Sequence, residues 1–191
     1  MNDDWKKLLY IIIGACLGVW LFYHLRRRYE SPEKKIIRRL KGHFDAYVLR
    51  LSIEHPSDPR VIRLSERYKQ TKLFESNTHE TYTLNKGEEV VMCLRDYSKN
   101  KQIHDDFNLL IFVGLHELAH IMSVTTDHEP EFWANFKFIL RTAAEMNMYN
   151  PVDYALDPVS YCAMVVYDNP YFYERTVKEF MIDIHNILQI K

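Results

Sequence analysis

Three of the chain's nine histidines fall within thirteen positions, in the segment "FVGLHELAHIMSVTTDHEPEFW" (residues 112–133). His116 and His120 are four residues apart, so on a helix their imidazoles lie one above the other on one face and can share a metal ion. Glu117 follows the first histidine directly. From there its carboxylate can flank a metal without coordinating it, as the general base for a metal-bound water must. The spacing predicts a catalytic metal site.

The residues around this motif are almost all apolar, which favours zinc over a chance pairing of histidines. Two imidazoles and a carboxylate buried in such a helix without partners would cost several kcal/mol. A bound metal removes that cost, and zinc is the metal typical of this ligand pattern. The sequence therefore predicts Zn2+ as the cofactor.

A catalytic zinc has three protein ligands and one open coordination position. We expect His128 to be the third ligand, because it follows His120 after the polar turn "SVTTD", where the chain can double back. Glu145 is the alternative, which requires the following helix to pack closely alongside the first. The candidates for the third ligand are His128, Asp127, Glu129, Glu131 and Glu145.

Helices are the main elements expected to position these side chains. Asp106 is a predicted N-cap of the apolar helix that carries the motif, and Pro130 is typical of the first turn of the next helix, which we expect to end near Met148. Apolar residues at helical spacing predict another helix over residues 31–53 and a shorter one over residues 61–68.

A hairpin is predicted around Asn85-Lys86-Gly87, where alternating Tyr, Thr and Val residues lie on both sides of the turn. Its second strand, "EEVVMCLR", can accept an extended peptide if it lies at a sheet edge, and a core strand is the equal alternative. The aromatic segment 150–172 is expected to be irregular, with a final helix over residues 174–188. The predicted fold class is α+β, mainly helical, with a small antiparallel hairpin or sheet.

The N-terminal segment "LLYIIIGACLGVWLFY" (residues 8–23) carries no charge and is followed by many Lys and Arg residues. This pattern predicts a membrane anchor, and a cleaved signal peptide is less favoured because no small-residue cleavage site follows. The positive charge after the segment places the C-terminal part on the cytosolic side. We expect two parts: residues 1–30, a transmembrane anchor with a basic flank, and residues 31–191, the zinc-binding domain.

Composition narrows the range of partners. The formal net charge of −1 at pH 7 provides no global basic field, so no nucleic acid is predicted as a partner. The three cysteines, without a C-x-x-C pair, favour a reducing compartment. Cys93 and Cys162 are expected to be buried small apolar residues, and Tyr154 and Tyr161 to serve in packing more than in stabilising an oxyanion.

The segment "HELAHIMSVTTDHEPEFW" resembles the active-site segment of WLM-type and SprT-like zinc metallopeptidases. The preceding "YTLNKGEEVVMCLR" is similar to the strand pair that WLM domains place before this helix, so the likeness covers roughly residues 71–161. The resemblance implies a zincin-like fold, with His116, His120 and His128 as zinc ligands and Glu117 as the catalytic base. An anchor in front of such a domain also resembles predicted proteins of large DNA viruses.

The function expected from these features is that of a membrane-anchored zinc metallopeptidase. It hydrolyses peptide bonds in a protein or peptide substrate with a zinc-bound water that Glu117 activates, and its C-terminal domain faces the cytosol or a virion interior. Two alternatives are a non-catalytic binding module stabilised by zinc and a protease acting on DNA-crosslinked proteins. The intact Glu117 disfavours the first, and the anchor disfavours the second.

The anchor leads to a prediction about membrane association. The chain should partition with membranes through residues 8–25, because an uncharged apolar helix is more stable in hydrocarbon than in water. Its C-terminus should be protected from external protease in sealed cells, as a protease-protection assay with a C-terminal tag would measure. A mature form beginning near Arg26 in the medium would instead identify a cleaved signal peptide.

Overall fold

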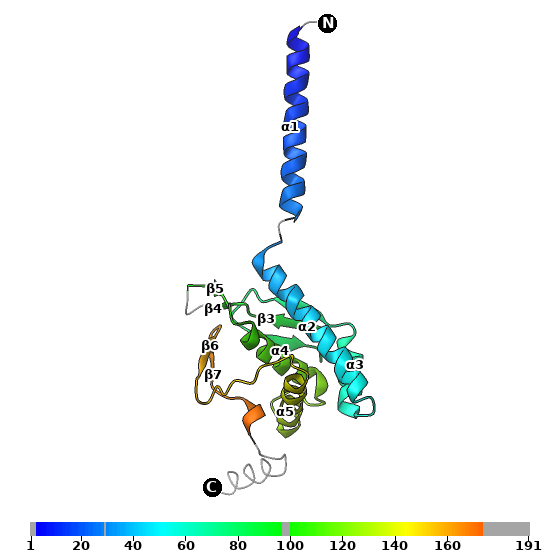
Figure 1. Cartoon of the computed structure of the whole chain (residues 1–191), viewed down its shortest axis with the longest axis vertical. Coiled ribbons are helices and arrows are strands. Elements are labelled where there is room, and N and C mark those ends of the chain that lie inside the picture. The colour runs from blue at the N-terminus through cyan, green and yellow to red at the C-terminus, as the bar shows by residue number, and fades with distance from the viewer. Residues whose placement is uncertain (1–2, 29, 97–99, 174–191) are drawn as a thin grey trace. The chain divides into compact units, whose positions relative to one another are not determined.

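The computed structural model describes residues 3–28, 30–96 and 100–173, and the predicted helix over residues 174–188 lies outside them. The helices are α1 (Asp3–Arg28), α2 (Pro32–Glu54), α3 (Pro59–Tyr68), α4 (Phe107–Met122), α5 (Pro130–Glu145) and the short 3-10 helix η1 (Pro170–Phe172). The strands are β1 (Lys72–Glu75), β2 (Tyr82–Leu84), β3 (Glu89–Met92), β4 (Arg95–Asp96), β5 (Gln102–Ile103), β6 (Val159–Tyr161) and β7 (Met164–Val166). The architecture is therefore mixed α+β, as predicted (Figure 1).

The chain divides into two compact units, Met1–Lys35 and Ile36–Lys191. The first contains α1, in which Trp5–His24 form a continuous stretch of 20 residues with a mean hydropathy of 1.6 and no burial. At 1.5 Å per residue this stretch rises about 30 Å, the thickness of a hydrocarbon core. By length and composition, one helix near the N-terminus can thus cross a membrane, although a signal sequence has the same properties.

The second unit is built around α4, which contacts α3, α5 and β2. In Figure 1, α4 lies between the strands and α5. Asp106 caps α4 as predicted, because its carboxylate accepts hydrogen bonds from the backbone N–H groups of Asn108 and Leu109. Twelve of its sixteen residues are buried, so this apolar helix occupies the centre of the core. The buried polar side chains of α4 must therefore be hydrogen-bonded or paired with other groups inside the protein.

Helix α2 covers α4 and α5 with its apolar stripe. The Phe44 ring packs against Gly114 of α4, and the Tyr47 hydroxyl donates a hydrogen bond to the carbonyl of Ile139 in α5 at 3.1 Å. Helix α5 begins at Pro130 as predicted but ends at Glu145, three residues before the predicted end. Asn147 adopts a left-handed conformation (φ 56°) just beyond it, which stops the helix.

The predicted hairpin is confirmed and belongs to a larger sheet. Strands β2 and β3 pair antiparallel, and Asn85 and Lys86 take the left-handed conformations that a tight hairpin turn requires. The sheet order is β1-β3-β2, with β1 parallel to β3, so the sheet is mixed and not purely antiparallel. Strand β1 was not predicted, because its four residues lack a distinct apolar alternation.

The segment 150–172 is more regular than predicted. Strands β6 and β7 pair antiparallel within it as a separate two-stranded sheet. The short turn at Cys162, which has a φ of 54°, carries none of the Gly or Asn residues that normally identify such a turn. This hairpin could therefore not be predicted from turn composition.

The contact between α2 and α4 leads to a prediction about stability. A Cβ atom at Gly114 would lie 2.0 Å from the Phe44 ring, whereas one at Gly42 would meet no atom within 4 Å. Gly114→Ala should destabilise the domain by about 1–3 kcal/mol through overpacking. Gly42→Ala, the matched control on an exposed helix surface, should stabilise it by roughly 0.5–1 kcal/mol. Urea unfolding of the two variants measures this difference, and equal stabilities would contradict the packing described.

Candidate metal centre

His116 and His120 lie on one face of α4, as their spacing predicts. Their Nε2 atoms are 3.3 Å apart, and their rings meet edge to face. Both side chains are partly buried, because α4 lies in the core and this part of its surface is partly open to solvent. The local helix geometry therefore presents two imidazole nitrogens to a single point.

His128 joins them from the turn that follows α4. Its Nε2 atom is 3.0 Å from that of His116, and the three ligand nitrogens all lie within 4.8 Å of one another. Four-coordinate zinc with Zn–N bonds of about 2.0–2.1 Å places its nitrogen ligands about 3.3 Å apart. Three convergent imidazoles therefore fit zinc in both spacing and donor type.

The acidic candidates for the third ligand lie elsewhere. Among the described residues, the group that can hold a metal comprises the three histidines and none of Asp127, Glu129, Glu131 or Glu145. Glu145 is exposed at the last residue of α5. The structure thus brings His128 to the other two histidines and leaves Glu145 apart from them, and the choice of His128 as the third ligand stays a prediction.

The surroundings keep the three imidazoles neutral at physiological pH. Burial, followed by the nearby histidines, lowers the pKa of His116 to about 3. Burial and the neighbouring His128 lower the pKa of His120 to about 4, and burial also lowers the pKa of His128. Neutral imidazoles keep a lone pair free, so the site is ready to bind a cation without first losing protons.

Glu117 is buried beside this cluster, with only 4% of its surface exposed. The Thr83 hydroxyl on β2 donates a hydrogen bond to its Oε2 atom at 2.7 Å. Burial raises the pKa of Glu117 to about 7, and the hydrogen bond from Thr83 opposes this shift. The carboxyl group therefore titrates near neutral pH, which suits a group that accepts and later returns a proton.

Basic side chains hold the end of α4 and the start of the turn. Arg67 donates hydrogen bonds to the carbonyls of Ile121 and Ser123, each at 2.8 Å, and Arg63 donates one to the carbonyl of Met122 at 2.8 Å. The last carbonyls of a helix lack partners within it and carry partial negative charge, so cations stabilise them. These two arginines of α3 therefore fix where α4 ends.

The turn itself is held from both sides. Lys86, in the β2–β3 turn, donates hydrogen bonds to the carbonyls of Val124 and Thr125. Glu131, in the first turn of α5, accepts from the backbone N–H groups of the same two residues at 3.1–3.3 Å. Glu131, a candidate ligand in the sequence, thus serves to shape the loop that carries His128.

An aromatic floor supports the three imidazoles from α5. The Phe132 ring centroid lies 4.8 Å from that of His116, 4.4 Å from that of His120 and 4.5 Å from that of His128. Phe132 is fully buried, so its ring restricts the rotamers of all three histidines. The ligand geometry is therefore held by packing as well as by hydrogen bonds.

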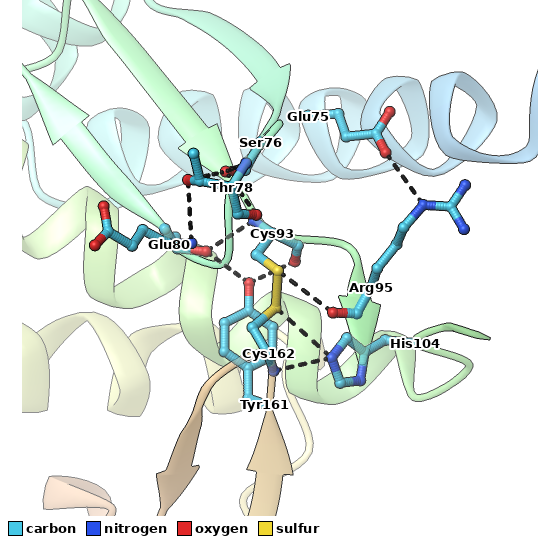
Figure 2. Close-up of a disulfide and its surroundings, with 10 residues drawn as sticks. Glu75, Ser76, Thr78, Glu80, Cys93, Arg95, His104, Tyr161 and Cys162 are labelled. Atoms are coloured by element: carbon cyan, nitrogen blue, oxygen red, sulfur yellow. Dashed lines mark hydrogen bonds and ion pairs between the residues drawn. A yellow bond between two sulfur atoms is a disulfide. The ribbon is translucent and has the colours of Figure 1, made fainter. Parts of the chain in front are cut away.

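Cys93 and Cys162 are buried, as predicted, but they also form a disulfide, which was not predicted. Cys93 and Cys162 are bonded across a sequence separation of 69 residues, with Cα atoms 6.4 Å apart (Figure 2). Closing a loop of that length stabilises a fold by about 4 kcal/mol in the chain-entropy account. The bond also weakens the argument for a reducing compartment that rested on the cysteine pattern.

Tyr161, next to this disulfide, has a structural role. Its hydroxyl donates a hydrogen bond to the Cys93 carbonyl at 2.7 Å and lies 2.8 Å from the Thr81 hydroxyl. Tyr154 is buried with its ring packed on Phe112. These contacts agree with the packing role expected for both tyrosines.

Several residues that shape the site escaped sequence reasoning. Thr83 could have been suspected, because it alternates inward on the predicted hairpin. Arg63 and Arg67 are four residues apart on a helix, and this spacing could have indicated a common target. That target depends on how α3 packs against α4, which no local pattern encodes.

Comparison with known proteins places these features in a family. The WLM domain family matches residues 60–155, which include α4, the turn and α5. "Uncharacterized protein R325" of Acanthamoeba polyphaga mimivirus is 37% identical over 111 residues, covering 56% of this chain and 55% of that protein. "Uncharacterized protein 136R" of Invertebrate iridescent virus 6 is 32% identical over 71 residues, covering 37% and 39% respectively.

The chain thus spans about half the length, or less, of these curated relatives. No solved structure gives a significant match. The matched segment holds the three histidines, Glu117 and the residues that fix their turn. The chain belongs to the WLM domain family.

Proposed function

We propose that this protein is a zinc-dependent metallopeptidase that hydrolyses peptide bonds and is anchored in a membrane by residues 8–25. The observation that carries the proposal is the convergence of three imidazole Nε2 atoms beside a buried carboxylate. Membership of the WLM family, which is protease-like, supports it. A purely structural zinc site has no need of a buried carboxylate beside its ligands.

His116, His120 and His128 would bind the zinc. Glu117 would accept and return the proton of the attacking water. When bound, the metal supplies Lewis acidity, which polarises a substrate carbonyl and acidifies water. Glu117 takes the proton of the attacking water and delivers it to the amine that leaves. Thr83 orients the carboxylate for both transfers through its hydrogen bond to Oε2.

Strand β2 is the element that we propose aligns the substrate. The sequence left open whether β3 is an edge strand or a core strand, and it lies in the centre of the sheet between β1 and β2, so the core alternative is confirmed. β2 is an edge of that sheet, and its Thr83 contacts the catalytic carboxylate directly. An extended peptide that adds to β2 would therefore pass beside Glu117.

Charge supports a cytosolic or virion-interior position for the C-terminal domain. Arg26, Arg27, Arg28, Lys34 and Lys35 follow the apolar segment, whereas Asp3 and Asp4 precede it. Lys and Arg residues near a membrane span favour the cytosolic side. The substrate is then a protein or peptide reached from that side.

The ligand set leads to a first prediction here. His128→Ala should lower zinc affinity by orders of magnitude, because it opens the coordination sphere, whereas Glu145→Ala should leave the affinity unchanged. Competition with a chromophoric chelator measures both affinities, and the unsubstituted protein should bind about one zinc per chain. If the alanine at 145 loses the metal while the one at 128 keeps it, the third ligand is the glutamate.

The catalytic role of Glu117 leads to a second prediction. Glu117→Gln keeps the shape of the side chain but cannot accept a proton, so casein hydrolysis should fall on the order of 10²–10⁴-fold. Zinc content should stay the same, because Glu117 is not a ligand. Glu145→Gln is the matched control and should keep full activity. A zinc-loaded protein that hydrolyses no peptide in any form would instead identify a non-catalytic binding module.

A further inference from the structure

We propose that Cys93 and Cys162 form a thiol–disulfide exchange site that takes a dithiol reductant and controls how firmly β2 holds Glu117. Cys93 directly follows β3, and Cys162 lies in the turn between β6 and β7. Figure 2 shows the bond joining these two segments, with His104 and Tyr161 beside it. Cys93 lies within the segment that matches the WLM family, whereas Tyr161 and Cys162 lie beyond its end.

The disulfide is one of the contacts that attach the β6–β7 hairpin to the rest of the domain, beside the packing of Val159 and Val166. Its two strands pair with each other and form a separate sheet, and Met164 and Val165 are exposed on β7. An isolated two-stranded hairpin is marginally stable in water. The disulfide and the bonds of the Tyr161 hydroxyl attach it to the β2–β3 hairpin and its flanks. Breaking the disulfide should therefore allow the β6–β7 hairpin to move away from the β2–β3 hairpin.

The conformation of Cys162 favours this release. Its φ of 54° lies in the left-handed region, which is costly for a residue with a Cβ atom. The surrounding bonds must hold it there, and the disulfide is one of them. Once the sulfur is free, Cys162 can relax toward an ordinary conformation.

His104 supplies a proton acceptor for the thiol that is released. Its Nε2 atom accepts the Cys162 N–H at 3.3 Å and lies 3.8 Å from the Cys162 sulfur. An imidazole nitrogen that accepts a hydrogen bond carries no proton, so it can take one from a thiol. A protonated imidazole then stabilises the Cys162 thiolate.

A short chain of contacts connects the disulfide to the catalytic base. The Thr81 hydroxyl accepts a hydrogen bond from the Cys93 N–H at 2.9 Å and lies 2.8 Å from the Tyr161 hydroxyl. Two residues further on, Thr83 donates to Glu117. Loosening the hairpin should therefore loosen β2 and the carboxylate it orients. The effect on hydrolysis rests on the proposed function, whereas the exchange reaction does not.

The exchange reaction balances with the reductant as the source of electrons. A thiolate of the dithiol attacks the Cys93 sulfur, forms a mixed disulfide and expels Cys162 as a thiolate. The second thiol of the reductant then attacks the mixed disulfide and releases Cys93. The reductant becomes a cyclic disulfide, and its two protons end on the two cysteines. Both cysteines are buried, so the hairpin must move before the attack.

The proposed cytosolic location determines the expected redox state of the Cys93–Cys162 pair. Cytosolic thiols are kept reduced, so a disulfide in a domain facing the cytosol is not maintained there. On that side the pair should be open, and it should close when the domain meets an oxidising environment. The redox state of the surroundings then determines whether the bond is closed, and so how firmly β2 holds Glu117.

The first test measures exchange in the folded protein. The full-length chain in detergent, with Cys16→Ser to remove the exposed free thiol, is titrated with reduced and oxidised dithiothreitol in the presence of a metal chelator. Alkylation and mass spectrometry should show Cys93 and Cys162 opening and closing together under native conditions. Thiols that appear only after denaturation would overturn the proposal and identify a static structural disulfide.

The second test measures the role of His104. His104→Gln should slow re-oxidation by oxidised dithiothreitol roughly tenfold, because the Cys162 thiol loses the imidazole nitrogen that takes its proton. His55→Gln is the matched control, since the His55 ring packs on Phe138 of α5. An unchanged rate in the His104 variant would show that the imidazole takes no part in the exchange.

The third test measures the coupling to β2. Reduction should speed amide hydrogen exchange in residues 159–166 and 81–84 and leave α2 unchanged, whereas unchanged exchange at 81–84 would overturn the coupling. The double variant Cys93→Ser/Cys162→Ser should hydrolyse casein more slowly than the oxidised protein, with no reductant present. If no form hydrolyses casein but the thiols exchange, the proposed function fails and the exchange site stands.

Discussion

The placement of two imidazoles and one carboxylate on a largely buried, apolar helix is the constraint on which the rest of the structure depends. α4 carries these groups through the core, where an unpaired polar side chain costs several kcal/mol. The structure satisfies the carboxylate with the Thr83 hydroxyl and turns the imidazole nitrogens toward one another. His128, from the exposed turn after α4, adds the third nitrogen, and a cation would satisfy the converging lone pairs together. The sheet, the turn and α5 all contribute to this arrangement.

The turn after α4 combines helix capping with placement of a ligand. Arg63 and Arg67 bind the last carbonyls of the helix, and Lys86 and Glu131 bind the backbone that follows. The same contacts that complete the helix therefore determine where His128 lies. This explains why a polar, exposed loop can hold a metal ligand within hydrogen-bond distance of His116.

The segment that matches the WLM family and the elements outside it contribute different parts of the structure. Residues 60–155 hold the candidate metal centre, and α2, outside that segment, packs on α4 and α5 through Phe44 and Tyr47. The β6–β7 hairpin is attached by a disulfide and reaches the same strand that orients Glu117. Burial also raises the pKa of Glu117 to about 7, so this strand and the core together set the environment of the carboxyl group.

The sequence by itself determined the elements that rest on local spacing. Helical periodicity predicted α2 and α4, and the Asp106 cap marked where α4 begins. Pro130 predicted the start of α5, and the Asn85-Lys86-Gly87 turn predicted the β2–β3 hairpin. His116 and His120 share a face because they are one helical turn apart. Tertiary structure alone decided the partners that lie far apart: β1 beside β3, the Cys93–Cys162 bond, Thr83 on Glu117 and the arginines on the end of α4. Local patterns reflect backbone geometry over a few residues, whereas these contacts depend on how whole elements pack, and packing is determined by the complete core.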